Sequence, residues 1–213
     1  MSQVVVIDYG MGNLRSVSKA LEAVGKNVLV EVTSDPVKIL AASHVVFPGQ
    51  GAIGACIDEL NKLNLTEVIQ VVAAQKPFLG ICIGMQLLLT RSDENNGVNG
   101  LNIFSGNVHH FDLPVSPDGS HLKVPHMGWN EAHQTVAHPL WHQIEQDSRF
   151  YFVHSYYVAP EDPEIIAATT NYPNAFASAV HKDNIFAVQF HPEKSQHAGL
   201  QLLKNFLSWD GQS

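Results

Sequence analysis

Residues 77–89 read PFLGICIGMQLLL, and this stretch decides the fold. Residues 78–81 form a short apolar run behind a proline, which is typical of a buried strand. Residues 83–89 are apolar almost throughout and predict a helix packed inside the domain. Cys82 therefore lies at a strand-to-helix junction, with a glycine two positions away on each side.

Such a junction is typical of a nucleophile elbow, with cysteine where hydrolases carry serine. The nucleophile is held in strained dihedral angles, and only small neighbouring residues avoid a clash with it. The turn directs the backbone N–H of Ile83 at the atom under attack, and the N-terminus of the helix favours the thiolate. The alternative is a small buried cysteine that only packs between strand and helix.

Composition limits the class of protein. Hydrophobic residues make up 45% of the 213 residues, so the chain can form a sizeable core as one domain over residues 1–213. The net charge is −8 and Lys/Arg runs are missing from the sequence, which speaks against a nucleic-acid partner. The two cysteines, Cys56 and Cys82, do not form a disulfide framework.

The N-terminus enters an apolar run directly, without the basic segment and cleavage site of a signal peptide. No apolar run is long enough to span a bilayer. We therefore expect a cytoplasmic protein that does not act at a membrane.

The first half of the chain alternates between strand and helix patterns. Residues 4–8, 28–32 and 44–47 are predicted strands, and residues 14–24, 53–60 and 66–74 are predicted helices, with a short helix opening at Pro36. Gly25 is expected to end the first of these helices. This spacing predicts parallel, right-handed crossovers and an α/β sheet.

The third strand ends in a glycine-rich loop, Gly49-Gln50-Gly51. In an open α/β sheet, ligands collect at the carboxyl ends of the strands, and bare N–H groups there can bind an anion. An ordinary turn between strand and helix is the alternative interpretation.

The second half of the chain does not continue the alternation of strand and helix patterns. Residues 91–102 are polar and predict a loop, and residues 113–119 predict a turn or mobile loop. Residues 107–111 and 150–158 are predicted strands, and residues 123–130 are predicted to form a short strand and a turn. Residues 165–169, 176–180 and 185–190 are predicted strands of an antiparallel meander, and residues 195–209 a closing helix. His138 and His142 are four apart, but Pro139 separates them and no acidic or thiol ligand accompanies them, so we expect surface histidines and no metal site.

His191-Pro192-Glu193 follows the last predicted strand. In extended backbone, residues two apart point the same way, so the imidazole and the carboxylate can meet. A carboxylate orients the ring and stabilises the imidazolium, and the histidine can then take the proton of Cys82. These three residues therefore predict a Cys-His-Glu triad. Taken alone, His-Pro-Glu is more often a surface turn.

Residues 80–86 (GICIGMQ) and 191–195 (HPEKS) together resemble the class I, triad-type glutamine amidotransferase domain. The resemblance covers nearly the whole chain. It implies a three-layer, flavodoxin-like α/β fold, with a mostly parallel central sheet flanked by helices and an added antiparallel strand region. It also implies hydrolysis of L-glutamine to glutamate and ammonia without a cofactor.

Residues 8–14 (DYGMGNL), 125–130 (PHMGWN) and 151–156 (YFVHSY) are similar to the glutaminase subunits of imidazole glycerol phosphate synthases, which act in histidine biosynthesis. This similarity implies a (β/α)8-barrel cyclase subunit as the partner that receives the ammonia. The positions implied near the interface are Met127, Trp129, Asn130 and Lys194. Gln50 stands where the family more often has Val, and His110 stands where Arg or Lys is usual.

The resemblance also assigns roles around the triad. It implies an oxyanion hole formed by the N–H of Ile83 and an N–H of the loop Gly49, Gln50 and Gly51. The glutamine contacts that it implies are Gly51, Gln86, Ser155 and Tyr156. The alternatives are a glutaminase subunit for pyridoxal phosphate or anthranilate synthesis, which residues 126–130 disfavour, and a catalytically silent regulatory subunit, which the presence of all three triad residues disfavours.

Overall fold

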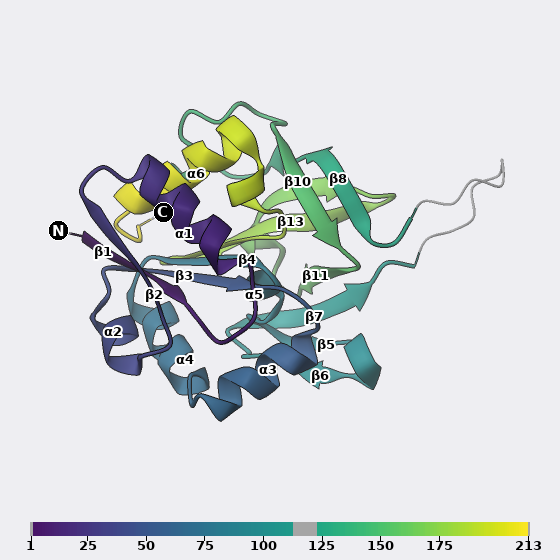
Figure 1. Cartoon of the computed structure of the whole chain (residues 1–213). Helices are drawn as coiled ribbons and strands as arrows, with labels where there is room; N and C mark the ends of the chain where they lie inside the picture. The colour runs from purple at the N-terminus through teal and green to yellow at the C-terminus, as the bar shows by residue number, and fades with distance from the viewer. Residues whose placement is uncertain (1, 113–122, 213) are drawn as a thin grey trace.

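The computed structural model describes residues 2–112 and 123–212 (Figure 1). The parallel part of its main sheet has the order β2-β1-β3-β4-β14. The strands are β1 (Ser2–Ile7), β2 (Val28–Thr33), β3 (His44–Gly49), β4 (Phe78–Cys82) and β14 (Ile185–Val188). β1, β3 and β4 are almost wholly buried, which agrees with their continuous apolar sequences.

Helices cover both faces of this parallel part (Figure 1). α1 (Leu14–Val24) and α6 (Gln196–Ser208) lie on one face, and α2 (Pro36–Ala41), α3 (Ile53–Lys62) and α4 (Thr66–Gln75) lie on the other. Asn13 and Asp35 accept backbone N–H groups at the starts of α1 and α2, and Gly25 ends α1 as expected. None of the helices in the described residues has the length and apolar character needed to cross a lipid bilayer.

The main sheet continues into an antiparallel part. β13 (Ala175–Lys182) pairs with β14, β12 (Ile166–Asn171) and β11 (Tyr156–Pro160), and β11 pairs in turn with β7 (Phe104–His110). β5 (Leu89–Ser92), β6 (Val98–Asn99) and β9 (His133–Gln134) complete the sheet. The expected α/β architecture with a mostly parallel centre and an added antiparallel region is confirmed.

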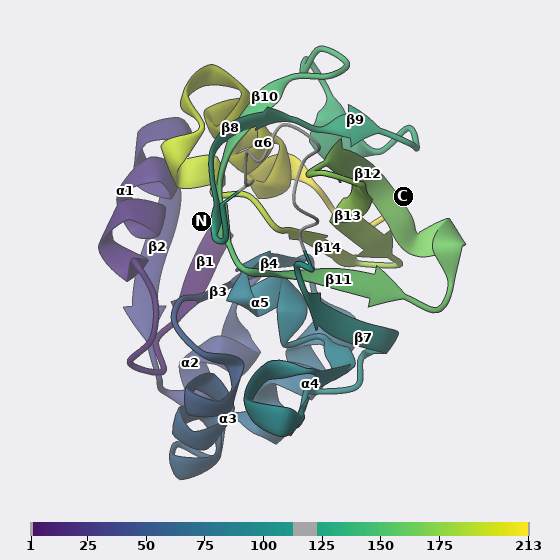
Figure 2. The same cartoon turned by 90° about the vertical axis from the view of Figure 1, so that its right-hand side faces the viewer.

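A separate two-stranded sheet consists of β8 (His126–Glu131) and β10 (Arg149–His154), which Figure 2 shows running beside each other. The prediction of one strand over residues 150–158 was therefore wrong. The chain breaks at Ser155, so that β10 pairs with β8 while β11 joins the main sheet. Both halves are aromatic and half-buried, and local composition does not reveal a change of partner strand.

The predicted helix over residues 83–89 was wrong in length. α5 (Ile83–Gln86) is a single turn, and the chain enters β5 at Leu89. Leu87, Leu88 and Leu89 are fully buried, and a buried apolar run does not distinguish helix from strand. The predicted loop over residues 91–102 contains the end of β5, a short 3-10 helix, η1 (Glu94–Asn96), and β6. The turn predicted for residues 113–119 lies outside the described residues.

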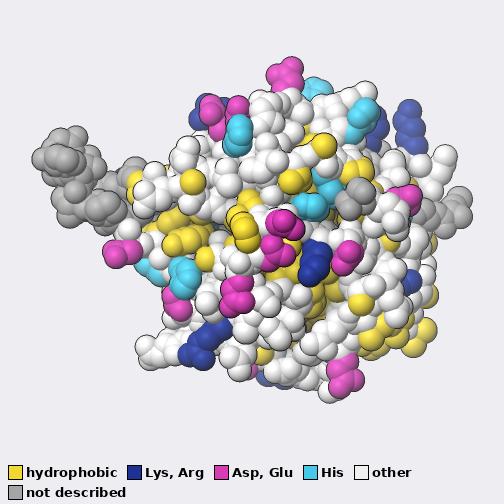
Figure 3. Space-filling model, turned by 180° about the vertical axis from the view of Figure 1, so that it is seen from behind, with side chains coloured by type: hydrophobic (Ala, Val, Ile, Leu, Met, Phe, Trp, Pro, Cys, Tyr) yellow, Lys and Arg dark blue, Asp and Glu magenta, His cyan; other side chains and the backbone are white. Residues whose placement is uncertain are grey.

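His138 is buried, contrary to the expectation of a surface histidine. It precedes η2 (Pro139–Trp141), its ring accepts the N–H of Leu140, and it packs against Phe186. His142 is exposed, as expected. The remaining short helices are η3 (Pro163–Ile165) and η4 (Pro192–Lys194). On the described part of the face seen in Figure 3, Lys and Arg side chains are scattered and do not form a continuous basic surface.

Candidate active site

Cys82 ends β4 and precedes α5, with φ 56° and ψ −111°. A positive φ is strained for a residue with a Cβ, so the expected strained turn is present. A Cβ on Gly84 would collide with the carbonyl oxygen of Phe47, and one on Gly80 would lie 2.9 Å from Cβ of Ala187. The flanking glycines therefore allow β4 and the turn to pack closely against β3 and β14.

His191 and Glu193 form a buried pair. His191 Nδ1 lies 2.9 Å from Glu193 Oε1, and both side chains are almost inaccessible to solvent. Burial alone would lower the pKa of His191, but its interactions with Cys82 and with the Glu193 carboxylate outweigh burial and raise the pKa to about 10. His191 is therefore an imidazolium at neutral pH in this state.

The backbone between His191 and Glu193 does not have the predicted extended conformation. Residues 192–194 form the 3-10 turn η4 instead of extended backbone. Ser195, which is buried, fixes this turn: its hydroxyl donates to the carbonyl of His191 at 2.6 Å and accepts the N–H of Tyr151 at 2.9 Å. The backbone N–H of His191 donates to the carbonyl of Tyr151 as well. The histidine is thus attached to β10.

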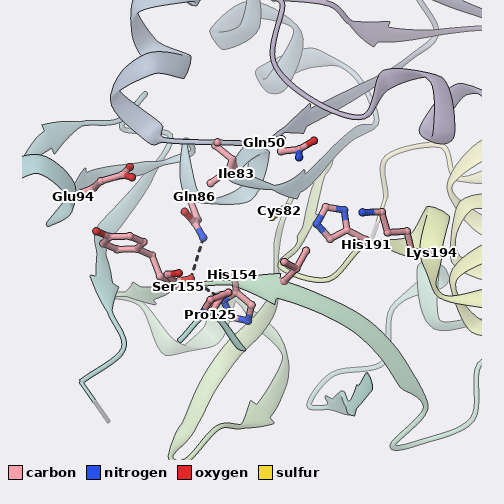
Figure 4. Close-up of a pocket in the computed structure, with 13 residues that line it drawn as sticks. Gln50, Cys82, Ile83, Gln86, Glu94, Pro125, His154, Ser155, His191 and Lys194 are labelled. Atoms are coloured by element: carbon pink, nitrogen blue, oxygen red, sulfur yellow. Dashed lines mark hydrogen bonds between the residues drawn. The ribbon is translucent and has the colours of Figure 1, made fainter. Parts of the chain in front are cut away.

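One cavity of about 310 Å³ lies over these residues (Figure 4). It is lined by Gln50, Gly51, Cys82, Ile83, Gln86, Glu94, Pro125, Val153, His154, Ser155, Tyr156, His191 and Lys194. The predicted nucleophile and base therefore lie in one cavity with most of the predicted oxyanion and glutamine-binding residues. Glu193 lies behind His191, and Gly49, Met127, Trp129 and Asn130 are not part of the lining.

The glycine-rich loop is held from beneath by two side chains. Tyr9 donates its hydroxyl to the carbonyl of Pro48 at 2.9 Å, and the thiol of Cys56 donates to the carbonyl of Gln50 at 3.7 Å. A Cβ on Gly49 would lie 2.7 Å from both the Tyr9 hydroxyl and Cβ of Ile83. Burial raises the pKa of Cys56 to about 11, so this second thiol is a poor nucleophile at neutral pH.

Gln86 is buried, and the NH₂ group of its side chain donates two hydrogen bonds. Its Nε2 donates to the carbonyl of Tyr156 and to Oε1 of Gln189, both at 3.0 Å. Its Oε1 is buried without a hydrogen-bond partner among the described residues. An unpartnered acceptor in the lining of a cavity is suited to an N–H group of a ligand.

Among the residues of this region that sequence reasoning missed, Glu94 and Gln189 make polar contacts that bear on the site. Glu94 lines the cavity, and its Oε2 accepts the N–H of Ile53 at the start of α3 at 2.6 Å. Gln189 is fully buried and donates to Cys82 Sγ at 3.7 Å. Glu94 lies in a polar run that was interpreted as a plain loop. The position of Gln189, two residues before His191, was the available signal.

Of the positions expected near an interface, Met127, Trp129 and Asn130 lie on β8 and Lys194 lies at the end of η4. Met127 and Trp129 are 62% and 39% exposed, so Trp129 is not a core residue. The Trp129 ring stands edge-on to Tyr151, its register partner on β10, and Lys194 Nζ lies 5.9 Å from the Tyr151 ring centroid. Asn130 instead donates inward, to the ring of His126 and to the carbonyl of Asn171. Lys194 reaches both this face and the cavity.

The family described as glutamine amidotransferase class-I matches residues 5–209. A protein of Nitrosococcus oceani named imidazole glycerol phosphate synthase subunit HisH is 61% identical over 213 residues, the whole of both chains. Its namesake in Hydrogenovibrio crunogenus is 55% identical over 98% of this chain and 97% of its own length. The solved structure of PurLQS from Thermotoga maritima has the same fold, with a TM-score of 0.68 at 16% identity over 97% of this chain and 98% of that one.

Proposed function

The chain belongs to the class-I glutamine amidotransferase family, and we propose that Cys82, His191 and Glu193 are its catalytic triad. Its function is that of the glutaminase subunit of imidazole glycerol phosphate synthase in histidine biosynthesis. We further propose that residues 1–213 form a single amidotransferase domain that works in the cytoplasm. The observations that support the triad are the buried His191–Glu193 pair and the strained backbone of Cys82, whose side chain lines the same cavity as His191.

The first half of the reaction consumes the imidazolium. The thiolate of Cys82 attacks the side-chain amide carbon of L-glutamine and forms a tetrahedral oxyanion. His191 gives its proton to the departing nitrogen, the C–N bond breaks, and ammonia and a thioester result. The negative sulfur contributes to the raised pKa of His191, so acylation of Cys82 makes this proton easier to release.

The second half restores both groups. Neutral His191 takes a proton from water while the oxygen attacks the thioester carbon, and collapse of this intermediate releases glutamate and the Cys82 thiolate. Glu193 keeps the ring oriented through Nδ1 in both halves. The oxyanion would be stabilised by the N–H of Ile83 and by an N–H of the loop Gly49-Gln50-Gly51.

The cavity has the chemistry that glutamine requires. Its volume of about 310 Å³ suits a single amino acid. The Glu94 carboxylate and the unpartnered Oε1 of Gln86 offer acceptors for the ammonium and N–H groups of the substrate. Ser155 and Tyr156, at the break between β10 and β11, complete the opposite wall.

The relatives are named as subunits of a synthase, which implies a further subunit. We propose that this partner is a (β/α)8-barrel cyclase, which uses the ammonia to form imidazole glycerol phosphate and aminoimidazole-carboxamide ribonucleotide. Met127, Trp129 and Lys194 would contact it, because exposed Met and Trp side chains often anchor interfaces. Asn130, which donates inward, would support this face from behind.

The direct experiment measures glutamate release by the complete chain with the barrel cyclase and its nucleotide substrate, together with formation of imidazole glycerol phosphate. Wild-type protein should perform both reactions, and Cys82→Ala should perform neither with glutamine. Cyclase activity of the Cys82→Ala complex should persist when ammonium salt replaces glutamine. Glutamate release by the alanine variant at the wild-type rate would remove Cys82 from the mechanism.

A further inference from the structure

Gln189 is a buried amide that the reaction scheme above does not use. It lies between the end of β14 and His191, and its backbone N–H donates to the carbonyl of Ser178. Its Nε2 donates to Cys82 Sγ at 3.7 Å, and its Oε1 accepts from Gln86 Nε2 at 3.0 Å. Both polar ends of the side chain are therefore partnered, one of them by the reactive sulfur.

The orientation of the Gln189 amide can be deduced from the carbonyl oxygen of Tyr156, which can only accept hydrogen bonds. A carbonyl only accepts, so Gln86 must present its NH₂ group to it, at 3.0 Å. The same NH₂ group faces Gln189, which must therefore present its oxygen to Gln86. The NH₂ group of Gln189 is left facing Cys82. Reversing the Gln189 amide would place two nitrogen donors together and an oxygen beside the sulfur.

The Tyr156 carbonyl is itself held by a second chain of hydrogen bonds. His154 Nδ1 donates to it at 2.8 Å, and His154 Nε2 is 2.9 Å from His126 Nδ1. Burial lowers the pKa values of His126 and His154 to about 4 and about 3, so both rings are neutral at neutral pH. His126 Nε2 then accepts from Asn130 Nδ2 at 3.2 Å. Each group in this chain therefore donates to the next one, from Asn130 on β8 through the two rings to the Tyr156 carbonyl.

We propose that Gln189 is a positioning residue, which donates a hydrogen bond to Cys82 Sγ and thereby orients the thiolate and favours it over the thiol. The proposal rests on the assignment of Cys82 as nucleophile. A hydrogen bond to a charged form favours that form, and here the donor is a fully buried amide held in place by Gln86. Gln86 therefore has a second role, since it fixes which end of Gln189 faces the sulfur.

The test is the rate at which iodoacetamide alkylates Cys82 in the complete chain, followed across pH and assigned by peptide mapping, so that Cys56 is distinguished. Gln189→Met keeps the length of the side chain and removes the donor. Its alkylation rate at neutral pH should fall about ten-fold, as expected for the loss of one hydrogen bond to a charged group. Its rate profile should move to higher pH. A purely structural defect would not produce that displacement.

The matched control is Gln134→Met, the same substitution on β9, where the side chain donates to the carbonyls of Ile144 and Glu145. It should leave the alkylation profile of Cys82 unchanged. Gln189→Glu is the second variant, because it preserves volume and places an acceptor beside the sulfur, and it should reduce alkylation further. Folding is checked by circular dichroism.

A folded Gln189→Met protein with the wild-type rate and profile would overturn the proposal. So would a change no larger than that of Gln134→Met. If Gln189→Met does not fold, Gln189→Glu decides: unchanged alkylation of Cys82 overturns the proposal and slower alkylation supports it. Alkylation does not require glutamine turnover, so failure of the triad assignment would be seen separately, in glutamate release by Cys82→Ala.

Discussion

His191 Nδ1 lies 2.9 Å from Glu193 Oε1, and the carboxylate is even less accessible to solvent than the ring that it orients. Glu193→Gln should therefore reduce glutaminase turnover while the protein still folds, because an amide can hydrogen-bond the ring but stabilises an imidazolium poorly. In other triads the acid contributes on the order of 10⁴-fold to kcat. Steady-state glutamate release gives the measurement.

His191→Ala is the comparison, and it should cost more than Glu193→Gln because it removes the base itself. The pH dependence adds a second test of the pair. The raised pKa of His191, about 10, depends partly on Glu193, so in Glu193→Gln the imidazolium should be lost at lower pH. Turnover unchanged within error in the glutamine variant would remove Glu193 from the triad.

The two cysteines provide an internal comparison. Cys82→Ala and Cys82→Ser should abolish glutamine hydrolysis without loss of folding or partner binding. Cys56→Ala should retain most of the activity, because the hydrogen bond from the Cys56 thiol to the Gln50 carbonyl is long, at 3.7 Å. Equal loss of activity in Cys56→Ala and Cys82→Ala, at equal thermal stability, would contradict the assignment of Cys82 as the nucleophile.

Three buried histidines should make stability fall in acid. Burial lowers the pKa values of His126 and His138 to about 4 and that of His154 to about 3. Below about pH 6.5 the unfolded chain binds protons that the folded chain excludes, so the free energy of unfolding should decrease as the pH falls from 6.5 towards 4. Each histidine adds up to about 1.4 kcal/mol per pH unit.

His191 acts in the opposite direction, because its pKa is raised: its contribution is complete below about pH 6.5 and is lost as the pH rises towards 10. Urea unfolding at pH 7.5, 6 and 5 measures the acid slope. His138→Phe, which packs in the same place against Phe186, should make this slope shallower. An identical slope in the wild type and His138→Phe would show that His138 does not contribute to it.

Much of the fold follows from local sequence, because β1, β3 and β4 are buried on both faces and therefore consist of continuous apolar runs. The elbow could be predicted as well, because the turn at Cys82 packs so closely on β3 and β14 that positions 80 and 84 have little room for a Cβ, and the glycines there are visible in the sequence. The end of α5 could not, because Leu87–Leu89 is equally apolar as helix or strand.

Contacts between polar side chains that are far apart in the sequence could not be predicted from local sequence either. Gln189 meets Cys82 across 107 positions of the chain, and Glu94 meets Ile53 across 41. Nothing in the residues next to Gln189 or Glu94 specifies these partners. Gln50, which stands where the family more often has Val, lines the cavity, and its carbonyl accepts a hydrogen bond from the Cys56 thiol. His110 lies edge-on to Tyr156, beside the proposed glutamine site.

The isolated chain should be a poor glutaminase that becomes active when the cyclase is docked and its nucleotide is bound. The loop that would supply an oxyanion N–H has glycines at 49 and 51, with Gly51 at φ 98°, so the peptides between them can change orientation at little steric cost. Loss of one oxyanion donor costs roughly 10²–10³-fold in rate. A nucleotide at a distance can restore the donor only if it favours one conformation of the complex.

Glutamate release should therefore be measured for the chain alone, for the complex, and for the complex with nucleotide, and it should rise at each step. Equal turnover in all three states would contradict gating and leave the triad assignment intact. Trp129→Ala should weaken assembly or reduce the stimulation, because its exposed ring lies beside Tyr151, whose backbone holds His191 and Ser195. Leu29→Ala, which removes an exposed side chain from the edge strand β2, should change neither. Normal assembly and normal stimulation in Trp129→Ala would place the docking surface elsewhere.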